Sequence, residues 1–148
     1  MATTYTELLY HIVFSTKERA PVIDAEWRDR LHEYMGGIIR SLGGYSEEIG
    51  GTIDHVHLLS RLKPTHCIAD VLCKLKKGSS EWVHNELDKR EFWWQEGYGA
   101  FTVSPSHIGR VKTYIANQER HHQKRSFKEE YVWLLKKAVI DYDERYLW

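Results

Sequence analysis

The order of strand-like and helical segments is the feature that most constrains the fold of this chain. Residues 5–15 form a near-continuous run of aromatic and β-branched residues, which is typical of a central strand. The further elements are a helix capped by Asp24 and stopped at Gly43, strands at 45–49 and 55–62, a helix at 68–87 and a strand at 100–103. This order predicts an α+β, ferredoxin-like split βαβ antiparallel sheet with helices on one face.

Two extra helices are expected after this unit. Ser104 and Pro105 combine an N-cap hydroxyl with a proline at the first helical position, which predicts a third helix to about Gln123. Ser126 and Glu129 form a capping-box pattern, so a fourth helix is expected to end near residue 139. Without a linker or repeat, residues 1–148 are expected to form a single domain.

Composition narrows the class of protein. Hydrophobic residues make up 42% of the chain, and no apolar run approaches the ~18 residues that a membrane span needs. The N-terminal residues lack a secretory pattern and there are only two cysteines, so we expect a cytoplasmic protein with no membrane partner. The formal net charge is zero, yet two local basic clusters favour an anion-binding groove over a nonspecific nucleic-acid coat.

Two histidines alternate with aliphatic residues in the third expected strand. His55 and His57 project from one face, while Val56 and Leu58 point into a core. Two imidazoles side by side can bind one divalent metal. A half-buried strand whose polar face carries histidine gives the same pattern, so spacing alone leaves both interpretations open.

The third expected helix carries a second polar constellation. Arg110, Tyr114, Gln118 and His121 follow helical spacing and share one face of that helix. A solvated helix face is the alternative interpretation. Tyrosine is a poor choice for a purely solvated position, however, and Tyr114 lies in the most basic part of the chain.

These residues are suited to phosphoryl transfer. The phenol of Tyr114 could attack a phosphodiester and retain the bond energy in a covalent link for later rejoining. A free phenol has a pKa near ~10, so it needs help at neutral pH. A divalent metal held by His55, His57 and Gln118 would stabilise the developing charge, and this nitrogen and oxygen donor set suits Mn²⁺ and tolerates Mg²⁺.

Five segments, in order and over the full length of the chain, carry a resemblance to a known family. They are YHIVFSTK (10–17), DHVHLL (54–59), VKTYIANQERHH (111–122), SFKEE (126–130) and DERYLW (143–148). With them the chain resembles the single-tyrosine HUH transposases of small bacterial and archaeal insertion sequences. The resemblance implies that His55 and His57 are the HUH metal ligands, Gln118 the third ligand and Tyr114 the nucleophile.

The same resemblance implies an activity and partners. The enzyme would be a metal-dependent endonuclease and strand transferase that cleaves and rejoins single-stranded DNA through a 5′-phosphotyrosine link, with Mg²⁺ or Mn²⁺ and no nucleotide cofactor. Family members recognise DNA hairpins at element ends and act as homodimers in which the tyrosine helix can complete the partner's site. The apolar C-terminus, which includes Leu147 and Trp148, is a further reason to expect a homodimer.

Further residues are candidates for supporting roles. Eight basic residues are candidates for contacts with DNA, although the first two could equally be solvated: Lys17, Arg19, Lys74, Lys76, Lys77, Arg110, Lys112 and Arg120. His121 and His122 follow the tyrosine closely enough to assist it. His11 is expected to be a hydrogen-bonded core histidine, whereas Trp93 and Trp94 are candidates for base stacking or an interface.

Two other functions fit the same pattern. A noncatalytic regulator could keep the fold and the basic groove to bind DNA hairpins, but retention of all four chemical residues argues against it. A related HUH enzyme could instead initiate replication, or act as a domesticated tyrosine nuclease on palindromic repeats. The short chain, which has no added helicase domain, favours the simple insertion-sequence type.

Overall fold

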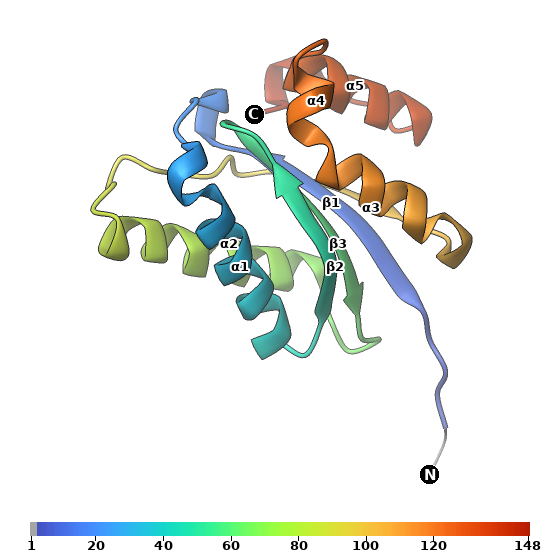
Figure 1. Cartoon of the computed structure of the whole chain (residues 1–148). Coiled ribbons are helices and arrows are strands. Elements are labelled where there is room, and N and C mark those ends of the chain that lie inside the picture. Colours follow the sequence, from blue (N-terminus) through green and yellow to red (C-terminus); the bar gives the residue numbers. More distant parts are fainter. Residues whose placement is uncertain (1–2) are drawn as a thin grey trace.

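Four antiparallel strands form one sheet in the computed structural model, which describes residues 3–148 (Figure 1). The strands are β1 (Leu8–Ser15), β2 (Tyr45–Gly51), β3 (His55–Leu62) and β4 (Gly99–Thr102), in the order β2-β3-β1-β4. β1 pairs with both β3 and β4, and β2 pairs with β3. This is the ferredoxin-like arrangement that the order of segments predicts.

Helices cover both faces of the sheet. One face carries α1 (Ala25–Ser41) and α2 (Ile68–Glu86), and the other carries α3 (Ile108–Ala116), α4 (Gln118–His122) and α5 (Phe127–Lys137) (Figure 1). Short 3₁₀ segments lie at Lys17–Arg19, Pro105–His107 and Glu144–Tyr146. Among residues 3–148, no helix combines the length and the apolar character needed to cross a membrane.

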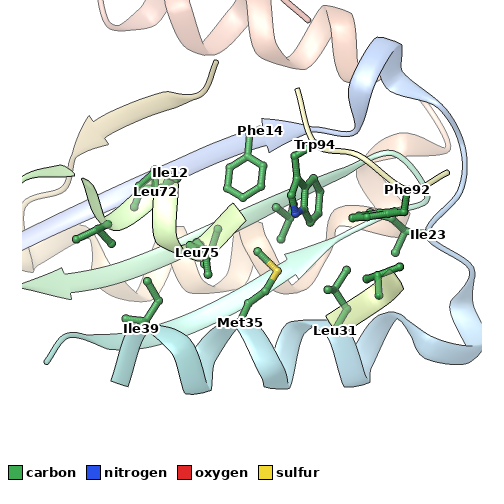
Figure 2. Packing of buried hydrophobic residues seen from close by; sticks show 14 of the residues in the cluster. Ile12, Phe14, Ile23, Leu31, Met35, Ile39, Leu72, Leu75, Phe92 and Trp94 are labelled. Atoms are coloured by element: carbon green, nitrogen blue, oxygen red, sulfur yellow. The ribbon is translucent and has the colours of Figure 1, made fainter. Parts of the chain in front are cut away.

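The main apolar core lies between the sheet and the α1–α2 layer. Ile12 and Phe14 of β1, with Val56 and Leu58 of β3, alternate onto this face and are fully buried. Helical residues complete this core (Figure 2): Leu31, Met35, Ile39, Leu72 and Leu75.

The two tryptophans proposed for base stacking lie in different environments. Trp94 belongs to this core, where its ring meets Phe14 edge to face at 4.8 Å between centroids and its indole N–H donates to Ser79 Oγ (2.9 Å). The proposal that Trp94 stacks on bases is therefore wrong, because its faces are already packed. Trp93 is 54% exposed and stays a candidate.

The C-terminus folds back onto its own chain. Leu147 is buried, and its carbonyl accepts a hydrogen bond from Gln95 Nε2 (2.9 Å). The Arg19 guanidinium lies 4.3 Å from the centre of the Trp148 ring. Intramolecular packing therefore covers much of the apolar surface from which a dimer was expected, although Tyr146 is exposed.

Two predicted boundaries are wrong for identifiable reasons. The first strand begins at Leu8 rather than residue 5, because its partner β3 ends at Leu62, directly opposite Leu8. The expected continuous helix to Gln123 is broken at Asn117, whose backbone angles (φ −100°, ψ 25°) separate α3 from α4. Asparagine is a weak helix former, because its short polar side chain competes for backbone hydrogen bonds.

Candidate active site

His55 and His57 are fully buried on the face of β3 opposite the main core. His55 Nδ1 donates to Asp54 Oδ1 (2.7 Å), and His57 Nδ1 lies 2.8 Å from Nε2 of His11. His11 is thus the buried, hydrogen-bonded histidine that we expected. Since the Nδ1 side of both rings is engaged, their orientations are fixed and the Nε2 atoms face the helices above the sheet.

Gln118 and Glu130 meet these rings from the helical layer. Gln118 is 1% exposed, and its Oε1 lies 2.9 Å from His55 Nε2. Glu130 is 2% exposed, and its Oε1 lies 3.0 Å from His57 Nε2, 3.0 Å from His122 Nε2 and 3.5 Å from His55 Nε2. Three imidazole nitrogens therefore converge on one carboxylate oxygen.

Tyr114 is joined to the same carboxylate. Its hydroxyl donates to Glu130 Oε2, and its ring centre lies 5.8 Å from that of His57. Burial and the adjacent Glu130 charge raise the pKa of the Tyr114 phenol above its ordinary value, so the hydroxyl keeps its proton at neutral pH. The tyrosine and the histidine pair thus share one site within a single chain.

Burial and hydrogen bonding set the charges at this centre. Burial lowers the pKa of His57 to about 4 and, together with His57, that of His11 to about 3, so both rings are neutral at neutral pH. Burial alone would raise the pKa of Glu130, but hydrogen bonds from His122 and His57 outweigh it and hold this pKa well below the ordinary value. A neutral His57 beside an ionised Glu130 has the protonation state that metal ligation requires.

The donors fit a divalent cation. The ligand atoms of His55, His122 and Glu130 lie within 4.8 Å of one another. Imidazole nitrogens combined with amide and carboxylate oxygens suit Mn²⁺ and are tolerated by Mg²⁺. The predicted ligands are brought together, because Gln118 contacts His55 directly and His57 joins them through Glu130.

Glu130 is the residue that sequence reasoning missed as a member of the site. It lies on the stripe of α5 that also contains Phe127, Tyr131 and Leu134, all of them buried. A carboxylate on an otherwise apolar helix face is the signal that could have found it, because burying an unpaired charge is costly.

A glycine allows the tyrosine helix to approach the sheet. A Cβ atom on Gly50 of β2 would lie 2.2 Å from the carbonyl oxygen of Ile115, so only glycine accepts α3 at this distance.

Two further contacts position the helices that follow α3. Arg28 of α1 forms an ion pair with Glu119 of α4 (2.5 Å), which joins α4 to the helices on the opposite face of the sheet. At the start of α5, Ser126 Oγ accepts from the Glu129 N–H (3.2 Å) as the capping pattern predicts.

The predicted DNA contacts divide between the two faces of the molecule. On the tyrosine side, Arg110 lines a cavity of about 530 Å³ together with Tyr114 and Lys137, and Arg120 is exposed on α4. Lys112 Nζ, also on α3, lies 3.9 Å from a Glu47 carboxylate oxygen.

The remaining predicted contacts lie on α2 and in the loop after β1. Lys74 and Lys77 are exposed on α2, across the sheet from Tyr114. The Lys76 ammonium donates to three backbone carbonyls (Gln95, Glu96 and Gly97), and burial lowers its pKa to about 8. Lys17 is exposed beside Arg19.

The two assisting histidines differ in position. His122 contacts the Glu130 carboxylate, whereas His121 is exposed, with its ring centre 4.8 Å from that of Tyr114. His121 lies seven residues, or about two turns, after Tyr114, and the two rings stay in contact across the break at Asn117.

Comparison with known proteins places the chain in a family. Residues 4–118, well over half of the chain, match the family model described as "Transposase IS200 like". The chain belongs to the IS200-like transposases. The matched segment includes His55, His57, Tyr114 and Gln118 of this transposase but ends before Glu130.

Solved structures share the fold. A Deinococcus radiodurans R1 protein assigned as a transposase is 27% identical, with a TM-score of 0.64 over 80% of this chain and 95% of that one. A REP-associated tyrosine transposase bound to a REP hairpin is 11% identical, with a TM-score of 0.56 over 78% and 68% of the two chains, and this likeness supports the fold alone. No match was found among curated proteins.

Proposed function

We propose that this IS200-like transposase cleaves and rejoins single-stranded DNA through a covalent bond between Tyr114 and a 5′ phosphate. The observation that carries this proposal is the shared carboxylate: Glu130 accepts the Tyr114 hydroxyl on one oxygen and contacts His57 with the other. The Glu130 side chain therefore connects the candidate nucleophile directly to the candidate metal donors, as a metal-assisted attack on phosphorus requires.

The chain's own residues would supply the attacking oxygen and orient it. Tyr114 Oη forms a bond to phosphorus, and the bond between phosphorus and the 3′ oxygen breaks. The hydrogen bond to Glu130 Oε2 orients the phenol. The phenolic proton passes to water as the new bond forms, and the leaving 3′ oxygen takes a proton from water to become the free 3′-OH, so the protons balance. His55, His57 and Gln118 would hold a Mg²⁺ or Mn²⁺ ion, which supplies charge stabilisation at the scissile phosphate when bound.

We propose single-stranded DNA hairpins as the substrate. The family and the shared fold with a REP-associated tyrosine transposase bound to a REP hairpin support this choice. The exposed Arg110 beside Tyr114, at the edge of the 530 Å³ cavity, is placed to contact a phosphate near the nucleophile. The other predicted basic contacts stay predictions.

We also propose a homodimer, as the resemblance implies. Within one chain Tyr114 already lies against His57, so a complete site needs no exchange of the tyrosine helix, and the shared site stays a prediction. Analytical ultracentrifugation at micromolar concentration tests the dimer, and a monomeric sedimentation coefficient would remove it.

Replacing the nucleophile tests the proposed chemistry. Tyr114→Phe removes only the hydroxyl, so the covalent DNA adduct should disappear while hairpin binding changes little. The control is Tyr146→Phe, which removes the same group from a side chain that is 77% exposed. Each protein is incubated with labelled hairpin DNA and Mn²⁺, with an EDTA-treated sample alongside, and resolved on a denaturing gel.

Three outcomes of this experiment are informative. Loss of the adduct in Tyr114→Phe and in EDTA, but not in Tyr146→Phe, supports a metal-dependent tyrosine nucleophile. An adduct that persists in Tyr114→Phe would assign the chemistry to another of the nine tyrosines. Hairpin binding without any adduct in the unaltered protein would favour the noncatalytic regulator.

A further inference from the structure

We propose that Glu130 is itself a ligand of the metal and supplies the negative charge that this centre needs. The inference rests on the proposed function, because it assigns an additional role at the same site. It assigns a ligand that comes from α5, beyond the family match at residues 4–118 and outside the set of His55, His57 and Gln118.

The spacing of the donor atoms supports this assignment. Ligand atoms that share one Mg²⁺ or Mn²⁺ ion at about 2.1 Å lie roughly 3 Å from their neighbours. Glu130 Oε1 lies 3.0 Å from His57 Nε2 and 3.5 Å from His55 Nε2, and His55 Nε2 lies 2.9 Å from Gln118 Oε1. The Glu130 oxygen therefore occupies the position of a fourth ligand beside the three predicted ones.

Charge balance supports it independently. The predicted ligands are two histidines and an amide, and each is no more than 1% exposed. A dication held by neutral ligands among buried side chains needs a compensating charge. Among residues 3–148, Glu130 carries the carboxylate that approaches these Nε2 atoms, while Asp54 contacts the Nδ1 side of His55 and faces away from the centre.

The second carboxylate oxygen connects the ion to the nucleophile. Glu130 Oε2 accepts the Tyr114 hydroxyl while Oε1 faces the imidazoles, so one rigidly held side chain spans both. His122 Nε2, 3.0 Å from the same Oε1, steadies the carboxylate from α4. Metal binding and the position of the phenol are thereby linked through a single residue.

The test is calorimetric titration of Mn²⁺ into the full-length protein without DNA. Glu130→Gln keeps the size of the side chain but removes its charge, and Glu129→Gln removes the same charge from the exposed neighbouring position. We expect Glu130→Gln to weaken Mn²⁺ binding by about tenfold or more, and Glu129→Gln to leave the affinity within about twofold. An affinity of Glu130→Gln equal to that of the Glu129→Gln control would overturn the proposal.

Further variants separate the possible failures. If Glu130→Gln does not fold, as judged by circular dichroism, Glu130→Asp carries the test, because its shorter carboxylate should weaken Mn²⁺ binding more than Glu129→Gln does. Equal affinity of these two variants would likewise overturn the role of Glu130. If His57→Ala weakens Mn²⁺ binding while the Glu130 variants do not, only this inference fails. If no variant changes the affinity, the proposed metal centre fails with it.

Discussion

Strand β3 contributes alternate residues to two interiors of this molecule. Val56 and Leu58 face α1 and α2, whereas His55 and His57 face α3 to α5, and all four side chains are 0% exposed. On the first face the neighbours are aliphatic and aromatic side chains. On the second face each imidazole nitrogen has a polar partner, such as Asp54 or Glu130.

The two interiors make different demands on the chain. An apolar interior needs total volume and shape, and it tolerates many exchanges among hydrophobic residues. A buried polar interior needs a specific partner for every donor and acceptor, because an unsatisfied group costs the full free energy of its desolvation. The site therefore depends on the exact docking of α3, α4 and α5, while the main core depends on packing alone.

The largest effects are expected when neighbouring residues of β3 are truncated on opposite faces of the sheet. Leu58→Ala should lower the free energy of unfolding by about 2–5 kcal/mol, because it leaves a cavity in the core. The folded fraction should still form the DNA adduct. His57→Ala should abolish the adduct even where the protein is fully folded, because it removes a candidate metal ligand.

Urea denaturation measures the first effect and the denaturing-gel assay measures the second. Both are read on the same samples, so that adduct formation is expressed per folded molecule. If Leu58→Ala reduced adduct formation per folded molecule as completely as His57→Ala, the idea that one face of β3 sets stability and the other sets activity would be wrong.

A smaller effect is expected where α3 meets the sheet. Gly50→Ala places a methyl group against the Ile115 carbonyl, so α3 must shift, at a cost of about 1–3 kcal/mol in the free energy of unfolding and with slower adduct formation. Gly109→Ala is the control: it adds the same methyl group to α3 itself, at a position where nothing lies within 4 Å of the Cβ atom. Thermal denaturation and adduct kinetics of both variants would show whether docking of α3 governs the chemistry; equal kinetics would contradict it.

The smallest expected effect compares the basic residues of the two faces. If DNA lies on the tyrosine side, changing Arg110 and Arg120 to Ala should lower the log–log slope of affinity against salt by about 0.7 for each phosphate that is no longer neutralised. Changing Lys74 and Lys77 of α2 to Ala removes the same charge from across the sheet and should leave the slope unchanged. A similar decrease from the α2 pair would show that the DNA also binds the far face, as the sequence predicts.

Local pattern was sufficient for the sheet and for two of the site residues. The third strand has the predicted bounds, because an alternation of period two places residues on known faces wherever one face is packed. Ser126 caps α5 as predicted, because capping depends on neighbours within one turn. The common face of His55 and His57 was predicted for the same reason, because it follows from their spacing; their role as metal ligands stays a prediction.

Contacts between distant segments could not be read from pattern. His57 meets Glu130 across 73 positions, so no local period relates them. The contact of His55 with Gln118, across 63 positions, was expected from the chemistry of the two residues and from the resemblance, not from any period. The positions of Trp94 and Lys76 depended equally on segments that pack against them.

Residue patterns along the chain predict the ferredoxin-like order, the shared face of His55 and His57, and the place of Tyr114 on a helix after the sheet. Packing between elements sets the break of the helix at Asn117, the contact of His122 rather than His121 with the Glu130 carboxylate, and the position of Glu130 between the histidines and Tyr114. The physical reason is that periodicity reports which face of an element is buried. Which atoms cover that face depends on how α4 and α5 dock, and docking is set by the free energy of the whole packed molecule.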